Sequence, residues 1–364
     1  MADGGADQPM GVADKGVATL SETDLGSRSD RGSEYADLSR LVRDTGLLDR
    51  RPRRYAARVT VILACLVLMG VLFVRLGSSW WQTATAAGVA VLLAQLAFLG
   101  HDAGHQQIFR SRQANDVVGL VCANLVTGIS YGWWVDKHNR HHAHPNTEGR
   151  DPDLAVRPLS FTPGQAAAQR GLGALFVRHQ AALFFPLLLA EGLHLHAASV
   201  RAVVSRGGLK RRRTEAGLLV LHFAGYLAAV FLVLSVPQAI VFILVNQALF
   251  GLYLGSSFAP NHKGMPVLTE ADNLDYLRRQ VLTSRNVRGG PFLDALLGGL
   301  NYQIEHHLFP SMPRPNLPQA QPLIRRFCAE HEIAYRETTL IQSWAQGLAH
   351  LRAVGAGSTR PGDG

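Results

Sequence analysis

The sequence predicts an all-α integral membrane protein, in which four transmembrane helices form two hairpins and a helical cap lies on the cytoplasmic side. Three observations support this fold class. Apolar residues make up 47% of the 364 residues and concentrate in four long runs. Arginine and lysine residues are concentrated on one side of those runs. Three clusters of histidines lie at or beyond the ends of the runs, on the same predicted side. These features predict a membrane protein whose basic residues and histidines lie at one face of the membrane.

The N-terminal part of the chain is polar before it becomes helical. Residues 1–32 are rich in Gly, Asp and Ser without apolar periodicity, which predicts a disordered tail. This tail has no apolar core of the signal-peptide kind, so we expect no cleaved targeting segment. From Tyr35 to Leu48 the apolar residues recur at roughly helical spacing and predict a short amphipathic helix. We expect one domain over residues 33–340 and a C-terminal tail over 341–364.

Four apolar runs are long enough to cross a membrane as helices. At a rise of about 1.5 Å per residue, each run approaches the roughly 30 Å thickness of the hydrocarbon core. Trp80 and Trp81 follow the first run, where aromatic residues of a membrane interface are common. The predicted spans are Val59–Leu76, Ala84–Gly100, Ala216–Ser235 and Ala239–Phe258.

Two further apolar stretches do not fit a simple span. Val117–Ile129 is too short to cross a bilayer and predicts a buried or re-entrant helix. Ala181–Ser199 contains Pro186 and Glu191, and its mixed character predicts an interfacial helix.

The distribution of basic residues predicts the orientation. The turns inside both hairpins carry almost no Lys or Arg, whereas the opposite flanks carry Arg50–Arg54 and Lys210–Arg213. Because basic flanks favour the cytoplasmic side, both termini and the central segment are expected there. The net charge of +9 suits an anionic membrane face or an acidic partner protein. No basic patch is interleaved with aromatic residues, so nucleic-acid binding is not expected.

Three histidine clusters lie on the predicted cytoplasmic face. The stretch "HDAGH" places two histidines four residues apart, on one face of a helix. The stretches "HNRHH" and "QIEHH" share the spacing i, i+3 and i+4, and each meets a proline three residues later, where the helix should end. The clusters are His101 and His105; His138, His141 and His142; and Gln303, His306 and His307.

Converging imidazoles predict a metal site. Seven are too many for one tetrahedral zinc ion, which takes four ligands, but they suffice for two metal ions with open positions. A histidine at a helix end is also commonly solvated or bonded to a carbonyl, yet three clusters on one face favour metal binding. The zinc-protease motif HExxH is absent from the sequence. We therefore expect a His-rich dinuclear metal site that activates a small molecule.

These clusters resemble the three histidine boxes of the membrane fatty acid desaturases, HxxxH, HxxHH and QxxHH. The flanking stretches "KHNRHHAHPN" and "GGLNYQIEHHLFPSMPR" match as well, and the likeness extends over about Leu38–Glu337. Residues 33–340 are thereby identified as a fatty acid desaturase domain. The glutamine that opens the third box is similar to that of the front-end desaturases and their bacterial acyl-lipid or acyl-CoA relatives.

The resemblance implies a reaction, cofactors and partners. The family uses two iron ions, molecular oxygen and two electrons to turn –CH₂–CH₂– into –CH=CH– in a fatty acyl chain carried by CoA or by a lipid. Many front-end desaturases carry a fused cytochrome b5 domain with an HPGG motif, which this sequence lacks. We therefore expect no bound haem or flavin, and a separate electron donor such as a ferredoxin with its NAD(P)H reductase. A bacterial cell membrane is the expected location.

The resemblance also implies roles for particular residues. The seven box histidines would bind iron, and His262 would be an eighth ligand, because relatives carry an extra histidine or asparagine near this point; the alternative is a histidine of an interfacial loop. Gln303 would take part in catalysis as a weak ligand or by hydrogen bonding, the alternative being a helix cap. Histidine ligands need outer acceptors that fix their tautomers, and the candidate acceptors are Asp102, Asp151, Asp153 and Glu305.

Two other functions compete with desaturation. A lipid hydroxylase, epoxygenase or ketolase could use the same di-iron scaffold, and product mass would distinguish it from a desaturase. A metal transporter or sensor is the alternative from another class. Transporters hold their ligand residues near the middle of the spans, whereas these clusters lie at or beyond the span ends, which argues against that alternative.

Overall fold

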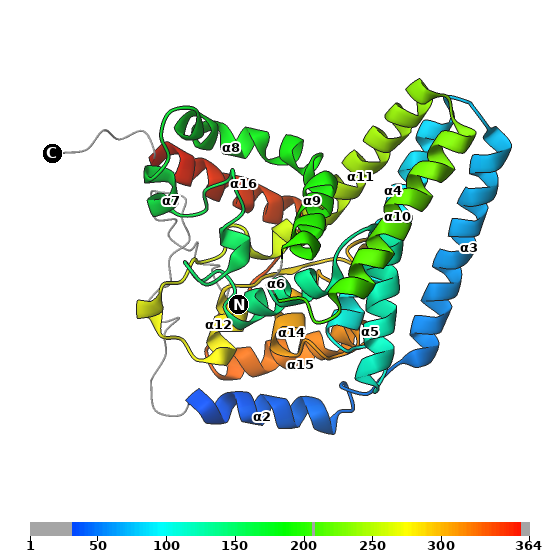
Figure 1. Cartoon of the computed structure of the whole chain (residues 1–364). Coiled ribbons are helices and arrows are strands. Elements are labelled where there is room, and N and C mark those ends of the chain that lie inside the picture. Colours follow the sequence, from blue (N-terminus) through cyan, green and yellow to red (C-terminus); the bar gives the residue numbers. More distant parts are fainter. Residues whose placement is uncertain (1–30, 206–207, 358–364) are drawn as a thin grey trace, which may run out of the picture.

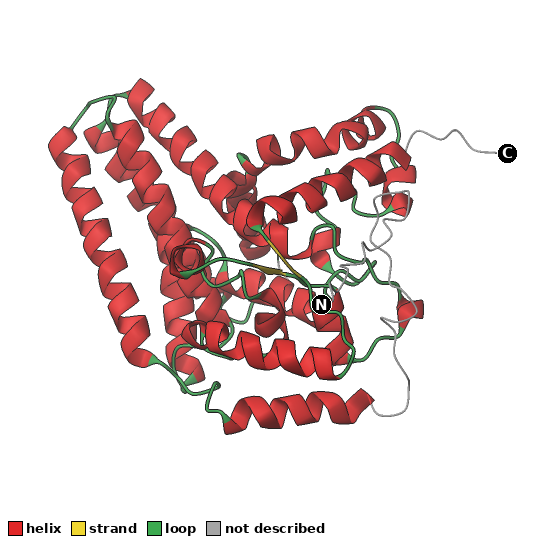
Figure 2. Ribbon diagram, turned by 180° about the vertical axis from the view of Figure 1, so that it is seen from behind, coloured by secondary structure: helices red, strands yellow, loops and turns green. Residues whose placement is uncertain are grey.

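The computed structural model describes residues 31–205 and 208–357, and its regular structure is almost entirely helical (Figure 1). Nearly all of the predicted N-terminal tail, residues 1–32, lies outside the described residues. Two short strands, β1 (Asn286–Val287) and β2 (Glu337–Thr338), pair in parallel near the centre of the molecule (Figure 2). Within the described residues the predicted helical character is confirmed, apart from this one pair of short strands.

Among the described residues, four helices are long and apolar enough to cross a membrane, or up to six if each of two bent helix pairs counts as one span. Each of the four contains most of one predicted apolar run. They stand together as one bundle in Figure 1. They are α3 (Pro52–Leu76), α4 (Gln82–Gly104), α10 (Arg212–Val233) and α11 (Val236–His262).

Helices α4 and α11 form the inner part of this bundle. Asn246 of α11 donates a hydrogen bond of 3.0 Å from its side-chain amide to the carbonyl oxygen of Ala86 on α4. Helix α3, in contrast, directs Val67 and Val74 outward with 67% and 68% of their surface exposed. An apolar outer surface of this kind suits a hydrocarbon environment. The inner pair holds buried polar residues, and α4 ends at the first histidine cluster while α11 ends at His262.

The segment after α4 bends sharply. Helix α5 (Arg112–Leu120) continues as the π-helix η1 (Val121–Thr127), and α6 (Tyr131–Ala143) leaves this rod at 112°. Gly128 makes the turn with a φ of 69°, and a Cβ atom there would lie 2.6 Å from His222 Nε2. The buried carboxylate of Glu215 accepts a 2.6 Å hydrogen bond from Ser130 Oγ, the N-cap of α6. Val117–Ile129 is therefore helical, but its second half is a π-helix.

The expected interfacial helix over Ala181–Ser199 is in fact two helices, α8 (Leu172–Leu188) and α9 (Glu191–Val204), bent by 81°. The bend lets the start of α9 approach α11 backbone to backbone. A Cβ atom on Gly251 of α11 would lie 2.4 Å from the amide nitrogen of Gly192, so this contact requires glycine. Hydropathy alone gave no sign of the bend.

The described part of the chain ends in a helix where the sequence predicted a C-terminal tail. Helix α16 (Leu340–Gly357) packs against α8 and covers most of residues 341–364. Its buried residues recur at helical spacing but are mainly small or polar, which is why their pattern was missed. They are Ser343, Gly347, His350, Leu351, Val354 and Gly355.

A second apolar core lies below the histidines, between α2 (Arg31–Asp44), α12 (Tyr276–Leu282), α14 (Gln303–Leu308) and α15 (Leu317–Glu330). Leu38 and Ile304 are fully buried in it, so the amphipathic N-terminal helix is confirmed. The remaining short elements are α7 (Pro163–Ala167), α13 (Pro291–Leu296) and three single turns, η2 (Pro152–Leu154), η3 (Glu270–Asp272) and η4 (Arg314–Asn316).

Candidate metal centre

Four helices deliver the histidine clusters to one place. Helix α4 carries His101 in its last turn, with His105 directly after its end, and α11 ends at His262. Helix α6 carries the second cluster on one face, and the short helix α14 carries the third. Both α6 and α14 end within a residue of their last histidine, as the prolines beyond them predicted. The seven box histidines and His262 form one continuous set of ring contacts.

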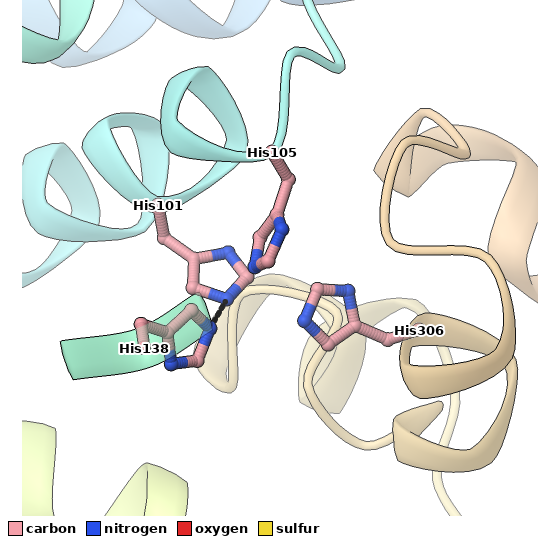
Figure 3. Close-up of side chains that lie close together, drawn as sticks. All are labelled: His101, His105, His138 and His306. Carbon is pink, nitrogen blue, oxygen red and sulfur yellow. Dashed lines mark hydrogen bonds between the residues drawn. The ribbon is translucent and has the colours of Figure 1, made fainter. Parts of the chain in front are cut away.

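Four of these histidines form a first group, His101, His105, His138 and His306. One ring nitrogen from each lies within 4.8 Å of the others. Figure 3 shows the rings pointing toward a common centre, with 3.2 Å between the Nε2 atoms of His101 and His138. The Nε2 atoms of His105 and His306 are buried without a hydrogen-bond partner.

A metal ion would explain the short separation between His101 and His138. Nitrogen ligands about 2.0–2.1 Å from a metal in tetrahedral geometry lie roughly 3.3–3.4 Å apart. Two neutral imidazoles whose unprotonated nitrogens face each other without a cation would repel, and a buried nitrogen without a partner costs about 1–3 kcal/mol. The residues present therefore fit a bound metal ion.

A second group consists of His141, His262 and His307. The Nε2 atom of His262 lies 3.3 Å from that of His141 and 3.1 Å from that of His307. The side-chain amide of Gln303 lies 2.9 Å from the same His262 nitrogen, so the predicted glutamine faces this group. These separations fit a second metal ion as well.

His142 connects the two groups. Its Nε2 atom lies 3.1 Å from that of His138 in the first group. Its ring stacks on His307 of the second group, with 4.1 Å between the ring centroids. The two groups are therefore neighbours, as a dinuclear centre requires.

The second group has outer hydrogen bonds that fix its ring tautomers. Each of its three histidines presents Nε2 to the group and donates from Nδ1 to an oxygen atom outside it. His307 donates to Gln280 Oε1 at 2.9 Å, and His262 donates to the carbonyl oxygen of Thr283 at 3.0 Å. Such outer acceptors leave Nε2 unprotonated and able to bind a metal. Both of these acceptors belong to α12 or follow it directly, and no sequence motif marked them.

His141 uses a predicted carboxylate. Its Nδ1 donates to both carboxylate oxygens of Asp151 at 3.0 Å. Asp153 lies slightly farther away, 3.6 Å from the same nitrogen, and forms an ion pair with Lys137. Burial lowers the pKa of His141, but the two nearby carboxylates raise it more, so the net shift is upward. Asp151 and Asp153 therefore stand where the expected outer acceptors should be.

The other two predicted carboxylates, Asp102 and Glu305, differ in whether they approach a histidine. Asp102 approaches His101 Nδ1 at 3.5 Å and forms an ion pair with the buried Arg314. Glu305 points away from the histidines: its carboxylate accepts a 2.6 Å bond from Tyr335 and a 2.7 Å bond from Asn286. On a helix, Glu305 is two residues from Gln303 and so faces the opposite side. The structure thus differs from the expectation that Glu305 contacts a ligand.

Burial keeps most of the ligands neutral. Burial, together with neighbouring imidazoles, holds the pKa of His105, His142, His306 and His307 well below the ordinary value. A neutral imidazole is the form that binds metal ions. The buried environment therefore keeps these histidines in the form that binds cations.

Other histidines remain outside both groups. His144 caps the end of α6 and is partly exposed. His196 bonds the carbonyl of Thr127, and His222 bonds the carbonyl of Leu125, both on the π-helix η1. These bonds satisfy carbonyl groups where regular helical bonding stops. His222, in the span α10, is thus held by the neighbouring helix η1.

An apolar cavity of about 390 Å³ adjoins the centre. His101, His138, His141, His262 and Gln303 form part of its wall. Most of the remaining wall is aromatic or aliphatic, including Trp133, Trp134, Phe161, Leu195, Leu254 and Phe258. The cavity can therefore hold a slender apolar molecule against the histidines.

Comparison with known proteins identifies similar chains. A family model described as "Fatty acid desaturase" matches residues 78–339. An acyl-lipid (9-3)-desaturase of Physcomitrium patens is 33% identical over 74% of this chain and 53% of its own length. The Delta(6)-fatty-acid desaturase fat-3 of Caenorhabditis elegans is 30% identical over 75% of this chain and 64% of its own. The Delta(5) fatty acid desaturase fat-4 of the same organism is 31% identical over 90% of this chain and 75% of its own length. The chain thus spans less than two thirds of the first two relatives.

The two histidine groups predict separable metal sites. Protein purified in detergent should contain about two transition-metal ions per chain. His306→Ala should weaken the first site and His262→Ala the second, because each removes a ligand from one group only, so each variant should retain about one ion. Metal analysis by mass spectrometry provides the measurement. The matched control is His144→Ala, a partly exposed histidine beside the second cluster, which should retain both ions. A single ion in the unaltered protein that survives His262→Ala would contradict this assignment.

Proposed function

This chain belongs to the fatty acid desaturase family, and we propose that it converts a –CH₂–CH₂– unit of a fatty acyl chain into –CH=CH– at a centre of two iron ions. The observation that carries the proposal is the meeting of two buried imidazole groups with one apolar cavity. The three relatives named above are all described as desaturases, which favours desaturation over hydroxylation, epoxidation or ketone formation on the same scaffold.

The reaction needs more than side-chain acid–base chemistry. The methylene hydrogens of an acyl chain are not acidic, so a general base cannot remove them. Bound iron would supply the activation of molecular oxygen that the removal of these hydrogens requires. In the overall balance, the acyl chain gives up two hydrogen atoms, and oxygen takes these with two electrons and two protons to form two water molecules.

The residues of the chain hold and tune this centre. His101, His105, His138 and His306 would hold one iron, and His141, His262 and His307 the other, with His142 completing either shell. Imidazole suits iron as a ligand, and neutral rings leave the positive charge of the metals largely uncompensated. The carboxylate of Asp151 and the amide of Gln280 keep their histidines in the metal-binding tautomer.

The cavity would position the acyl chain. The apolar wall formed by Leu254, Phe258 and Trp133 excludes water and presents methylene groups to the histidines. Holding one carbon pair against the centre replaces a random encounter with a fixed geometry. We infer that the acyl chain is carried by CoA or by a lipid, and that a separate protein, such as a ferredoxin with its NAD(P)H reductase, supplies the electrons.

Product mass tests the proposal. The full chain, expressed in a host with a ferredoxin and its reductase, should yield fatty acids that have lost two hydrogens. His306→Ala should abolish this product, because it removes a ligand of the first group. Mass analysis of total fatty acids provides the measurement. A product heavier by one oxygen atom would identify a hydroxylase or a related oxygenase instead, and would contradict desaturation.

Gln303 provides a sharper test of the centre. Its amide faces His262 Nε2 at 2.9 Å and lines the cavity, and its oxygen accepts from Asn261. We expect Gln303→Ala to lower turnover at least about tenfold while the protein stays folded in the membrane. Gln303→His should keep its iron, because it restores the spacing of the second cluster. Turnover and iron content are measured for both variants beside His306→Ala. Unchanged turnover in Gln303→Ala would show that the amide takes no part in the reaction.

We further propose that both termini and the metal centre lie in the cytoplasm. The basic segments Arg50–Arg54 and Lys210–Arg213 lie at the starts of α3 and α10, at the end of the bundle where α6 and α14 lie (Figure 1). The turn between α3 and α4 would then face the outside. This arrangement exposes the centre to soluble electron carriers.

Labelling from outside the cell tests this orientation. Single cysteines are introduced at Ser79, in the turn after α3, and at Ser311, just beyond the third histidine cluster. A membrane-impermeant thiol reagent added to intact cells should label the cysteine at position 79 and leave that at 311 unmodified. Both should react after the cells are opened, which controls for accessibility. Labelling at position 311 in intact cells would invert the proposed orientation.

A further inference from the structure

The outer face of α6 carries a shallow hollow directly behind the metal centre. The hollow, of about 510 Å³, is lined by Asp136, Asn139, Arg140, Ala143, His144 and Arg150. The opposite face of the same helix carries the second histidine cluster, whose His141 and His142 are buried. A single helix therefore separates the centre from this surface, which we call the α6 hollow.

The α6 hollow presents arginine side chains to solvent. Arg140 is 59% exposed and pairs with Asp136 at 3.2 Å, and Arg150 is 50% exposed and pairs with Glu270. Exposed pairs of this kind contribute little to stability, so a partner's carboxylates can compete for the guanidinium groups. A third arginine, Arg279, donates a 3.2 Å hydrogen bond to the carbonyl of Ala143 in the wall of the hollow. Three guanidinium groups therefore surround one small area.

A short route leads from this hollow to both metal groups. The exposed Ala143 is bonded covalently to His142. His142 in turn lies 3.1 Å from His138 of the first group and stacks at 4.1 Å on His307 of the second. The backbone carbonyl of His142 also accepts from Gln280, whose amide oxygen accepts from His307. One residue thus connects the surface to both groups.

We propose that the α6 hollow is the docking surface for a small acidic protein that carries one electron at a time. The inference rests on the proposed function, because desaturation consumes two electrons for each double bond. Each encounter oxidises the carrier by one electron and reduces the metal centre by one, so one turnover needs two encounters. Carboxylates of the carrier pair with Arg140 and Arg150, and this charge complementarity steers the approach.

The basic segment Arg50–Arg54, which leads into α3, is the competing surface. Its Arg53, in the first turn of α3, is exposed. This segment lies at the start of a candidate span, where basic side chains meet lipid headgroups. Its arginines also hold loops in place, since Arg54 donates to the carbonyl of Pro315. The α6 hollow has both exposed arginines and a short route to the histidines. The segment that leads into α3 has exposed arginines without such a route.

Charge reversal distinguishes the two surfaces. The full chain in detergent is titrated with an oxidised [2Fe–2S] ferredoxin at low ionic strength, and binding is measured directly. The double variant Arg140→Glu/Arg150→Glu should weaken binding about tenfold or more, because two attractive pairs become repulsive. The matched control is Arg326→Glu, an exposed arginine of α15 that pairs with Glu330 at the same i, i+4 spacing. It should leave affinity within about twofold.

A second readout uses turnover. With reduced ferredoxin, the double variant should need a higher carrier concentration for half-maximal turnover, and added salt should reduce the difference from the unaltered protein. Binding of the oxidised carrier does not require desaturation, so a chain that binds ferredoxin through the hollow but yields no desaturated product would refute the proposed function alone. Unchanged affinity in the double variant, or a loss of affinity in Arg53→Glu alone, would overturn the docking proposal.

Discussion

The burial of eight imidazole rings that face one another is the constraint on which the rest of the structure depends. Ring nitrogens of His105, His142 and His306 are buried without a partner, and each would cost about 1–3 kcal/mol if nothing bound there. Adjacent unprotonated nitrogens also repel across separations of 3.1–3.3 Å. Bound cations would remove both penalties, and metal binding would then be coupled to the folding of this region.

The surrounding fold keeps these rings in place from several directions. Helices α4 and α11 run from the membrane bundle into the centre and end at His101 and His262. The buried carboxylate of Glu215 holds the start of helix α6 through Ser130. This contact fixes the position of the helix that carries the three histidines. Helix α12 supplies Gln280, which bonds His307 and the backbone of His142 at once. Distant segments are thereby tied to one set of rings, and the apolar cavity forms beside the same rings.

Local spacing in the sequence predicted the histidine clusters, because residues at i, i+3 and i+4 share a helical face wherever the helix lies. The four apolar runs were equally predictable from length and hydropathy. The outer acceptors Gln280 and Thr283 were not, since an amide or a backbone carbonyl carries no signature and their placement depends on how α12 packs. Glu305 was expected at the centre from proximity in sequence, yet its i+2 position relative to Gln303 directs it to the other side. The bend between α8 and α9 depends on a contact between Gly192 and Gly251, which only the three-dimensional structure reveals.

X-ray absorption at the iron edge of the purified, iron-loaded protein tests the central claim most directly. Two irons held by two imidazole groups should give a first shell of nitrogen and oxygen atoms, outer-shell scattering from imidazole rings and a second iron nearby. His262→Ala and His306→Ala should each reduce the imidazole scattering. A single iron without an iron neighbour, or a first shell containing sulfur, would contradict the assignment of these histidines to a dinuclear centre.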